Sequence, residues 1–252
     1  MKQLPLPLQR RLKGDLNYLT LHHIADSYQE TATTAAAKGW SHIQYLATLV
    51  GQEAESKQDR ATQRRIKQAR FPVLKTLDQF NWSWPEKINR LQVENLFQLD
   101  FVNNKANVIF LGGVGLGKTH LTTALAYHAC LNGTKVLFAT AIDIINNLSS
   151  AQQGGRFQQE LKKYLKPGLL AVDELGYLPI DKYGADLLFQ VISHRYEQGA
   201  MIISTNRAFK HWPEIFNNDA ILTSAILDRL LHHAEAVVIE GKSYRMKEVV
   251  EL

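Results

Sequence analysis

The chain has 252 residues, of which 45% are hydrophobic, and it carries a formal net charge of +5 at neutral pH. This length and composition predict one medium globular domain with a large core and a smaller appendage. No apolar run approaches the roughly 20 residues that a membrane helix needs, which argues against a membrane protein. The single cysteine, Cys130, excludes an internal disulfide and a cysteine-based zinc site, and it favours a reducing cytoplasm.

The positive charge is concentrated in the N-terminal part. Residues 1–106 contain 15 basic and 10 acidic side chains, whereas residues 107–252 contain 14 of each. The densest basic stretch runs from Lys57 to Lys75, and its only acid is Asp59. A charge run is usually a solvated surface, but a row of like charges also lowers helix stability and favours an anionic partner. Because all the excess lies here, we expect this part to contact nucleic acid.

The N-terminal part is expected to be helical. Leu12–Tyr28 is interpreted as one helix, which Ala32–Lys38 continue weakly. A second helix is expected to begin at Ser41, because its spacing to Gln44 is that of a capping box. Two alternatives stay open for it: it runs undivided to the break at Phe71, or Gly51 divides it.

The second half of that helix contains the candidates for DNA contact. Arg60, Arg64 and Lys67 share one helical face, so they can meet a row of phosphates together. Side chains suited to base edges are scarce on this face, which predicts binding to the nucleic-acid backbone rather than to bases. The candidate residues are Arg60, Arg64, Arg65, Lys67 and Arg70.

An aromatic segment formed by Phe80, Trp82 and Trp84 precedes the next expected helix, Val93–Val102. Aromatic clusters of this kind mostly pack against other residues, and a place beside an adenine ring is the alternative. We expect the domain boundary near Trp84. The predicted parts are a helical domain at 1–84, in which the nucleic-acid contacts are expected, and a second domain at 85–252.

From Asn107 onward, short and continuously apolar runs alternate with helical stretches. This alternation predicts an α/β fold in which helices cover both faces of a parallel sheet. Ligands of such folds bind outside the carboxyl ends of the strands. The expected strands are Val108–Leu111, Val136–Ala139, Leu169–Val172, Met201–Ser204 and Ala236–Ile239.

The first expected strand leads into a segment that matches the phosphate-binding loop pattern G-x-x-x-x-G-K-T in full. The glycines allow successive backbone N–H groups to turn inward around a triphosphate. Lys118 then reaches the terminal phosphates of ATP, the hydroxyl of Thr119 ligates Mg²⁺, and the following helix directs its positive end at the phosphates. The expected nucleotide-binding residues are Gly112, Gly113, Val114, Gly115, Leu116, Gly117, Lys118, Thr119 and His120.

Two acids, Asp173 and Glu174, end the third expected strand. Carboxylates at the end of a buried strand are costly unless a cation or another positive group meets them. We therefore expect Asp173 to hold Mg²⁺ with Thr119, and Glu174 to orient and polarise the water that attacks ATP.

Two further residues are candidates for catalysis. Asn206 follows the fourth expected strand, where an amide offers a donor and an acceptor to the attacking water or to a γ-phosphate oxygen. Arg229 lies among apolar neighbours in an expected helix, and an arginine there can stabilise the charge that develops on the phosphoryl group. Arg245 is a second arginine candidate with less support. The pairs at His22 and His232 lack a cysteine partner and i, i+4 spacing, so the sequence predicts no metal site built from protein ligands alone.

Together these segments resemble the IstB-like transposition helper ATPases, which are AAA+ relatives of DnaC-type helicase loaders. Besides the phosphate loop, the resemblance rests on Asp173–Pro179, Arg195–Glu197, Ser204–Asn206, Asp228–Leu230 and Gly241–Arg245. It implies a P-loop AAA+ fold with a five-stranded parallel sheet in the order 5-1-4-3-2, preceded by a small all-helical domain. It also implies that Asn206 senses the γ-phosphate and that Arg229 is an arginine finger acting on a neighbouring subunit. The implied function is ATP-dependent assembly of a homo-oligomer on double-stranded DNA and delivery of a cognate transposase.

Two other functions share parts of this pattern. A DnaC-like helicase loader has the same ATPase motifs and differs in what its N-terminal domain binds. A small-molecule kinase also uses a phosphate-binding loop, but it has no need for a water-activating residue such as Glu174. The sequence therefore favours a nucleic-acid-dependent ATPase over a kinase.

Overall fold

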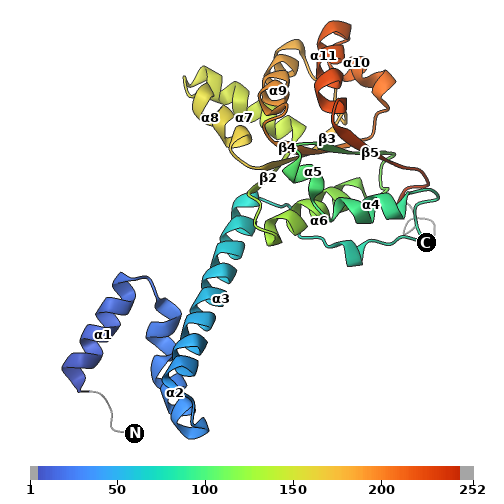
Figure 1. Ribbon diagram of the computed structural model, residues 1–252. Coiled ribbons are helices and arrows are strands. Elements are labelled where there is room, and N and C mark those ends of the chain that lie inside the picture. The colour runs from blue at the N-terminus through green and yellow to red at the C-terminus, as the bar shows by residue number, and fades with distance from the viewer. Residues whose placement is uncertain (1–4, 245–252) are drawn as a thin grey trace, which may run out of the picture. The chain divides into compact units, whose positions relative to one another are not determined.

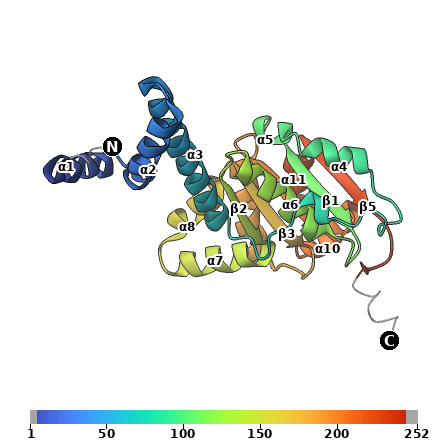
Figure 2. The same cartoon turned by 90° about the horizontal axis from the view of Figure 1, so that it is seen from below.

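The computed structural model describes residues 5–244, and the chain forms two compact units, residues 1–64 and 65–252 (Figures 1 and 2). Helix α3, His42–Ala69, runs from the first unit into the second. Residues 65–84, expected to belong to the helical domain, group with the second unit, and the functional division at residue 84 stays a prediction. Among residues 5–244, no helix is long and apolar enough to cross a membrane.

The first unit contains α1, Leu6–Tyr18, α2, His22–Lys38, and the first part of α3. The prediction of one helix over Leu12–Tyr28 is wrong, because Thr20 adopts a left-handed backbone with φ of 57° and the chain turns there. The turn lets both helices contribute to a small apolar cluster of Leu16, Ile24, Ala25 and Leu49.

The start of α3 is capped as the sequence predicts. The N–H of Gln44 donates to Oγ of Ser41 at 3.2 Å, and the N–H of Ser41 donates to Oε1 of Gln44 at 2.9 Å. Two backbone donors that the helix leaves unpaired are thereby satisfied.

The second unit is built on a parallel sheet of five strands among the described residues. Its order, β2-β3-β4-β1-β5, is the predicted order 5-1-4-3-2 read from the other edge, so that prediction is confirmed. The strands are β1 Asn107–Gly112, β2 Val136–Thr140, β3 Leu169–Leu175, β4 Ala200–Thr205 and β5 Ala234–Ile239.

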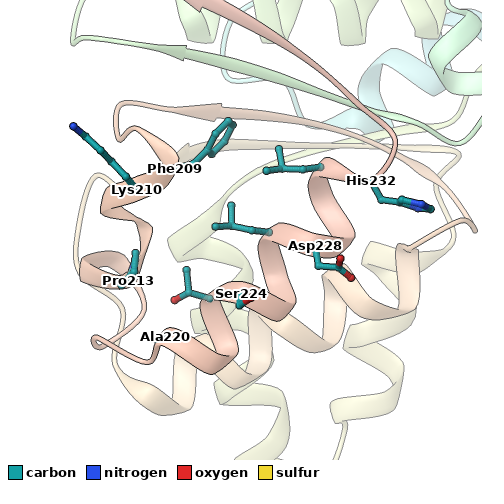
Figure 3. A pocket seen from close by; sticks show the side chains of 10 residues that line it. Phe209, Lys210, Pro213, Ala220, Ser224, Asp228 and His232 are labelled. Carbon is teal, nitrogen blue, oxygen red and sulfur yellow. The ribbon is translucent and has the colours of Figure 1, made fainter.

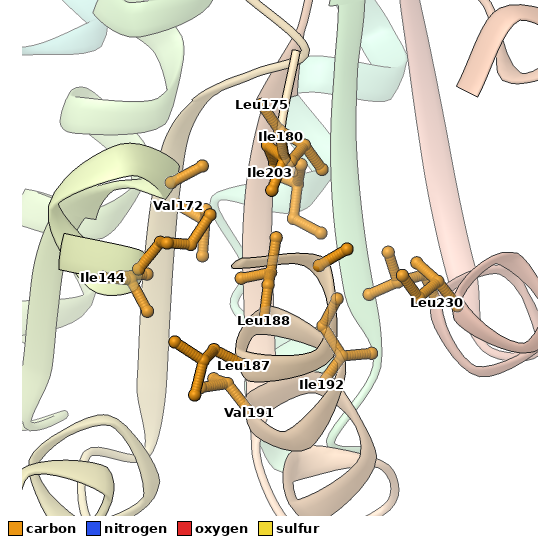
Figure 4. Close-up of a cluster of buried hydrophobic side chains, with 14 of the residues drawn as sticks. Ile144, Val172, Leu175, Ile180, Leu187, Leu188, Val191, Ile192, Ile203 and Leu230 are labelled. Carbon is orange, nitrogen blue, oxygen red and sulfur yellow. The ribbon is translucent and has the colours of Figure 1, made fainter. Parts of the chain in front are cut away.

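Helices cover both faces of this sheet. On one face the apolar cluster involves α7–α9, α10 and α11 (Figure 4), and on the other face a second cluster involves α4, α5 and α6. The helical elements are η1 Leu77–Gln79, α4 Arg90–Leu96, α5 Asp100–Asn103, α6 Lys118–Leu131, α7 Ala141–Gln153, α8 Phe157–Leu165, α9 Lys182–Arg195, η2 Phe209–His211, α10 Trp212–Ile215 and α11 Ala220–Leu231. The single helix expected over Val93–Val102 is instead divided between α4 and α5, because Leu99 has a left-handed φ of 64°.

The alternation of side chains along each strand explains why the strands are continuously apolar. Leu169 and Ala171 of β3 pack on the α6 face, whereas Leu170 and Val172 pack on the α9 face. Both faces of the strand are therefore removed from water, and each residue must be hydrophobic. The polar residues that end the strands lie together at the carboxyl edge, where Thr140 pairs in register with Asp173.

Candidate nucleotide-binding site

The phosphate-binding loop joins β1 to α6, and two of its glycines have backbones that require glycine. Gly115 and Gly117 have φ of 75° and 85°. A Cβ on Gly117 would lie 2.6 Å from Cε2 of Phe80, and one on Gly115 would lie 2.1 Å from Oγ of Ser243. The loop is thus closely approached by the aromatic segment and by the C-terminal segment. Nζ of Lys118 donates to the carbonyl of Gly113 at 2.6 Å.

The carboxylate of Asp173 is buried at the end of β3 and accepts two hydrogen bonds from hydroxyl groups. Oγ1 of Thr119 lies 3.1 Å from its Oδ1, and the hydroxyl of Ser204 donates to the same oxygen. The structure therefore brings together the two residues expected to hold Mg²⁺. A hydroxyl and a carboxylate oxygen are both ligands that Mg²⁺ accepts, so this pair fits the ion.

Glu174 follows directly and differs from Asp173 in its environment. Its side chain is exposed, its φ is 60°, and its backbone N–H donates to Oγ of Ser204 at 3.0 Å. The pairing between β3 and β4 shifts at this point, between Val172 and Leu175. A left-handed backbone is costly for a glutamate, and such strain concentrates at functional sites. The shift directs Glu174 away from the core, where it can meet water.

Asn206 lies just beyond β4, at the same edge of the sheet. Its Oδ1 is buried and has no hydrogen-bond partner among residues 5–244. A buried amide oxygen without a partner costs free energy, so it favours a water or ligand atom that donates to it.

A cavity of about 630 Å³ adjoins the phosphate-binding loop. Two aromatic side chains that are distant in sequence, Trp84 and Tyr244, line it. Their rings pack edge to face, with the centroids 5.1 Å apart. The indole of Trp84 also donates to the carbonyl of Lys242 at 2.9 Å. The lining residues include Pro72, Phe80, Trp84, Lys118, His120 and Tyr244. Of the aromatic segment, Phe80 and Trp84 therefore face this cavity.

His120 connects the aromatic segment to the loop. Its ring packs edge to face against Phe80 at 5.4 Å, and Nε2 lies 2.8 Å from the carbonyl oxygen of Thr76. Burial, and to a smaller extent the ammonium of Lys75, hold the pKa of His120 below its ordinary value, although the bond to Thr76 acts in the opposite direction. A neutral ring that donates to Thr76 suits this position and keeps the segment on the loop.

Arg229 lies at the opposite edge of the sheet from the phosphate-binding loop. It lines a small pocket with Asn107 and Met201, which lie near the starts of β1 and β4. The guanidinium lies 5.1 Å from the ring of Phe189, and Nη1 donates to the carbonyl of Ala225 at 2.9 Å. A strand rises about 3.3 Å per residue, so the two ends of β1 are roughly 17 Å apart. The structure thus separates Arg229 from the loop of its own chain.

Helix α11 also borders an open groove of about 620 Å³ (Figure 3). Its lining includes Ser224 and Asp228 of α11 and Phe209 and Pro213 of the η2–α10 segment, which Figure 3 labels. The second arginine candidate, Arg245, lies outside the described residues.

The basic residues of α3 differ in what they contact. Nη2 of Arg60 donates to Oε1 of Glu53 at 3.1 Å, and Nε of Arg65 donates to the carbonyl of Cys130 at 3.0 Å. Arg64 and Lys67 are exposed, and so is Arg70, which follows the end of the helix with φ of 61°. DNA contact by these residues stays a prediction.

Comparison with known proteins identifies the family. The profile of the IstB-like ATP-binding proteins matches residues 14–251. The chain belongs to this family. The ATP-binding protein assigned to insertion sequence IS5376 of Geobacillus stearothermophilus is 36% identical over 241 residues, which are 96% of each chain. The one assigned to IS21 of Pseudomonas aeruginosa is 38% identical over 92% of this chain and 88% of the relative.

A solved structure supports the fold. The DnaC helicase loader aligns with a TM-score of 0.53 and 21% identity, over 66% of this chain and 96% of the loader. This similarity, together with the sheet order, confirms the predicted AAA+ P-loop fold. The protein is thus an ATP-binding protein of the kind found in IS21-type insertion sequences, with a DnaC-like fold.

Sequence reasoning missed two parts of the site. Ser204 was noted only as part of a motif, although a hydroxyl inside an otherwise apolar strand that ends beside Asp173 is a usable signal. The contact of Gly115 with Ser243 and Tyr244 was missed as well, because Gly115 and Ser243 are 128 positions apart in the sequence. The N–H of Tyr244 donates to the carbonyl of Gly115 at 3.0 Å.

Proposed function

We propose that the protein is an ATPase that assembles on double-stranded DNA and helps a cognate transposase engage target DNA. The observation that carries this proposal is the cluster in which Asp173 accepts hydrogen bonds from Thr119 and Ser204 while Glu174 points outward. Two relatives over 35% identical are assigned to insertion sequences, which favours transposition over helicase loading.

Hydrolysis follows from the roles of these side chains. The loop N–H groups and Lys118 hold the phosphates of ATP. Mg²⁺ bound by Thr119 and Asp173 would neutralise part of the charge on the phosphate oxygens. Glu174 accepts a proton from water while the water oxygen bonds to the γ-phosphorus. The bond from that phosphorus to the bridging oxygen breaks, which gives ADP and phosphate. The amide oxygen of Asn206 accepts a hydrogen bond from the same water.

Assembly accounts for the position of Arg229. Because it lies at the sheet edge far from its own phosphate-binding loop, it stabilises phosphoryl charge only if it reaches the nucleotide of a neighbouring subunit. The proposed contact with DNA is through α3, where exposed Arg64 and Lys67 can neutralise phosphates. The transposase is the partner that insertion-sequence relatives suggest.

Two substitutions test the proposed ATPase. Lys118→Ala should weaken ATP binding roughly 10- to 100-fold, because it removes a charge-assisted contact to ground-state phosphates. Glu174→Gln should retain ATP binding and lower kcat at least about 100-fold, because Glu174 acts only when water attacks. Binding is measured with a fluorescent ATP analogue and turnover by phosphate release, with and without duplex DNA. Lys135→Ala, an exposed lysine at the opposite edge of the sheet, is the control. Near-normal turnover by Glu174→Gln would refute the assignment.

A further inference from the structure

We propose that Glu197, His232 and His233 form a binding site for Zn²⁺, at the sheet edge opposite to the nucleotide. One nitrogen of each histidine and a carboxylate oxygen of Glu197 lie within 4.8 Å of one another. Zn²⁺ is commonly bound by imidazole nitrogen together with glutamate oxygen, and three protein ligands leave one position for water. The proposal is independent of ATP hydrolysis.

The three ligands come from two different turns. Glu197 lies between α9 and β4, and the histidines lie between α11 and β5. Sequence spacing argued against metal binding by the histidine pair because it does not reveal the third ligand. Only the fold brings the carboxylate of Glu197 beside them.

Backbone hydrogen bonds hold both turns in place. The N–H of Asn107 donates to the carbonyl of His233 at 2.7 Å, which fixes this residue to the start of β1. The N–H of Gln198 donates to the carbonyl of Arg195 at 2.9 Å, and Glu197 between them has a left-handed φ of 57°. The backbones that carry the ligands are therefore positioned before an ion binds, which lowers the entropy cost of binding.

The side chains lie near the spacing that metal ligands require. The hydroxyl of Tyr196 lies 2.8 Å from Nδ1 of His232, so it orients this ring, as supporting hydrogen bonds do for metal-binding histidines. Nε2 of His233 lies 3.8 Å from Oε1 of Glu197, and the two imidazole centroids are 4.0 Å apart. All three side chains are exposed, so small rotations can shorten the spacing to the roughly 3–3.5 Å that zinc–nitrogen bonds of about 2.1 Å require.

Charges around the cluster permit a cation. Besides Glu197, the acid Asp228 and the cations Arg229 and Lys105 are nearby. The guanidinium of Arg229 is held over Phe189 and is bonded to a carbonyl oxygen. A bound ion would connect the ends of α9 and α11, one helical turn beyond Arg229.

Metal titration of the full, tag-free chain tests the site. In excess Mg²⁺ and without nucleotide, Zn²⁺ is titrated by calorimetry and Co²⁺ by visible absorption, where a tetrahedral site gives an intense band. We expect one ion per chain. Glu197→Gln and His233→Ala should each weaken binding about 10- to 100-fold, and Tyr196→Phe should weaken it less.

The adjacent histidines on α2 provide the matched control. His22→Ala with His23→Ala removes an exposed and a half-buried histidine that belong to no group of three metal-ligating side chains among residues 5–244, and it should leave binding unchanged. Zn²⁺ should also raise the Tm of the wild type, reversibly with EDTA, and not the Tm of Glu197→Gln. Equal affinity of wild type, Glu197→Gln and His233→Ala would overturn the proposal, as would an equal loss in the control.

Discussion

Ser204 links the two acids of the candidate site. Its hydroxyl donates to Asp173 and at the same time accepts from the backbone N–H of Glu174. One side chain thus determines where the carboxylate of Asp173 points and where the backbone of Glu174 turns. It touches neither ATP nor water in the proposed mechanism, so it is a positioning residue.

Ser204→Ala should lower kcat about 10- to 100-fold with little change in ATP affinity, because supporting hydrogen bonds to metal-binding carboxylates have effects of this size. The Mg²⁺ concentration that gives half-maximal turnover should rise. Steady-state ATPase assays over a Mg²⁺ series measure both quantities. Ser193→Ala is the control, because Oγ of Ser193 is buried and has no partner among residues 5–244. Unchanged Mg²⁺ dependence would mean that Ser204 only packs.

The residue scale also shows what sequence can predict of this site. An apolar strand ending in Asp173 and Glu174 predicts a carboxylate pair at the carboxyl edge, and the structure places both there. The contact with Ser204 depends on the register between β3 and β4 and on the shift after Val172. No local pattern specifies that register, so the contact required the structure.

At the scale of elements, the first part of α3 stabilises the helical unit, and its last part is the predicted DNA contact. Glu53 is buried, and it accepts from the N–H of Ile24 at 2.9 Å and from Arg60 at 3.1 Å. This carboxylate thereby caps the start of α2. Burial alone would raise the pKa of Glu53, but the bond from Ile24 and the charges of Lys57 and Arg60 together lower it. Part of the basic run therefore stabilises the helical unit instead of remaining available for DNA.

The lowered pKa of Glu53 predicts acid sensitivity of the first unit. A carboxylate whose folded pKa lies below its unfolded value, about 4.3, stabilises the fold above that pH. The contribution is lost as the pH falls from there through the folded pKa. Protection factors of the α2 amides, which correct for the pH dependence of intrinsic exchange, should therefore fall at acid pH, and Glu53→Gln should show low protection already at pH 6. Glu55→Gln, an exposed neighbour, should behave like the wild type. Equal exchange in both variants would contradict the capping role.

The exposed basic residues at the end of α3 are predicted to bind DNA. Neutralising Arg64, Lys67 and Arg70 together should weaken binding to all DNA duplexes alike, because the phosphate backbone is the same whatever the base sequence. Each lost phosphate contact should lower the slope of log affinity against log salt by roughly 0.9. Fluorescence anisotropy over a salt series measures the slope, and ATP binding should persist. Neutralising three exposed lysines of the second unit is the matched control; these are Lys135, Lys182 and Lys210. An unchanged slope would move the DNA site elsewhere.

At the scale of the whole molecule, topology was more predictable than helix boundaries. Continuous apolar runs separated by helical stretches specify a parallel sheet, and the family resemblance supplied its order. The breaks at Thr20 and Leu99 were missed, because each is a single left-handed residue with no glycine or proline to mark it. The cluster of Glu197, His232 and His233 and the cavity between the aromatic segment and Tyr244 could not be predicted for a related reason, since segments distant in sequence build them.

In the proposed mechanism, the separation of Arg229 from its own phosphate-binding loop makes the complete active site a property of the assembly. Arg229→Ala and Glu174→Gln proteins should each be inactive, yet an equal mixture should recover DNA-stimulated ATPase. Random mixing unites an intact Glu174 with an intact Arg229 at about a quarter of the interfaces. A mixture of Glu174→Gln with Lys118→Ala is the control. Every subunit in it lacks either Glu174 or Lys118, so no nucleotide site is complete whichever subunit supplies Arg229. Co-assembly is verified by pulling down one labelled variant with the other. Co-assembled but inactive mixtures would show that Arg229 acts within its own chain or only supports α11.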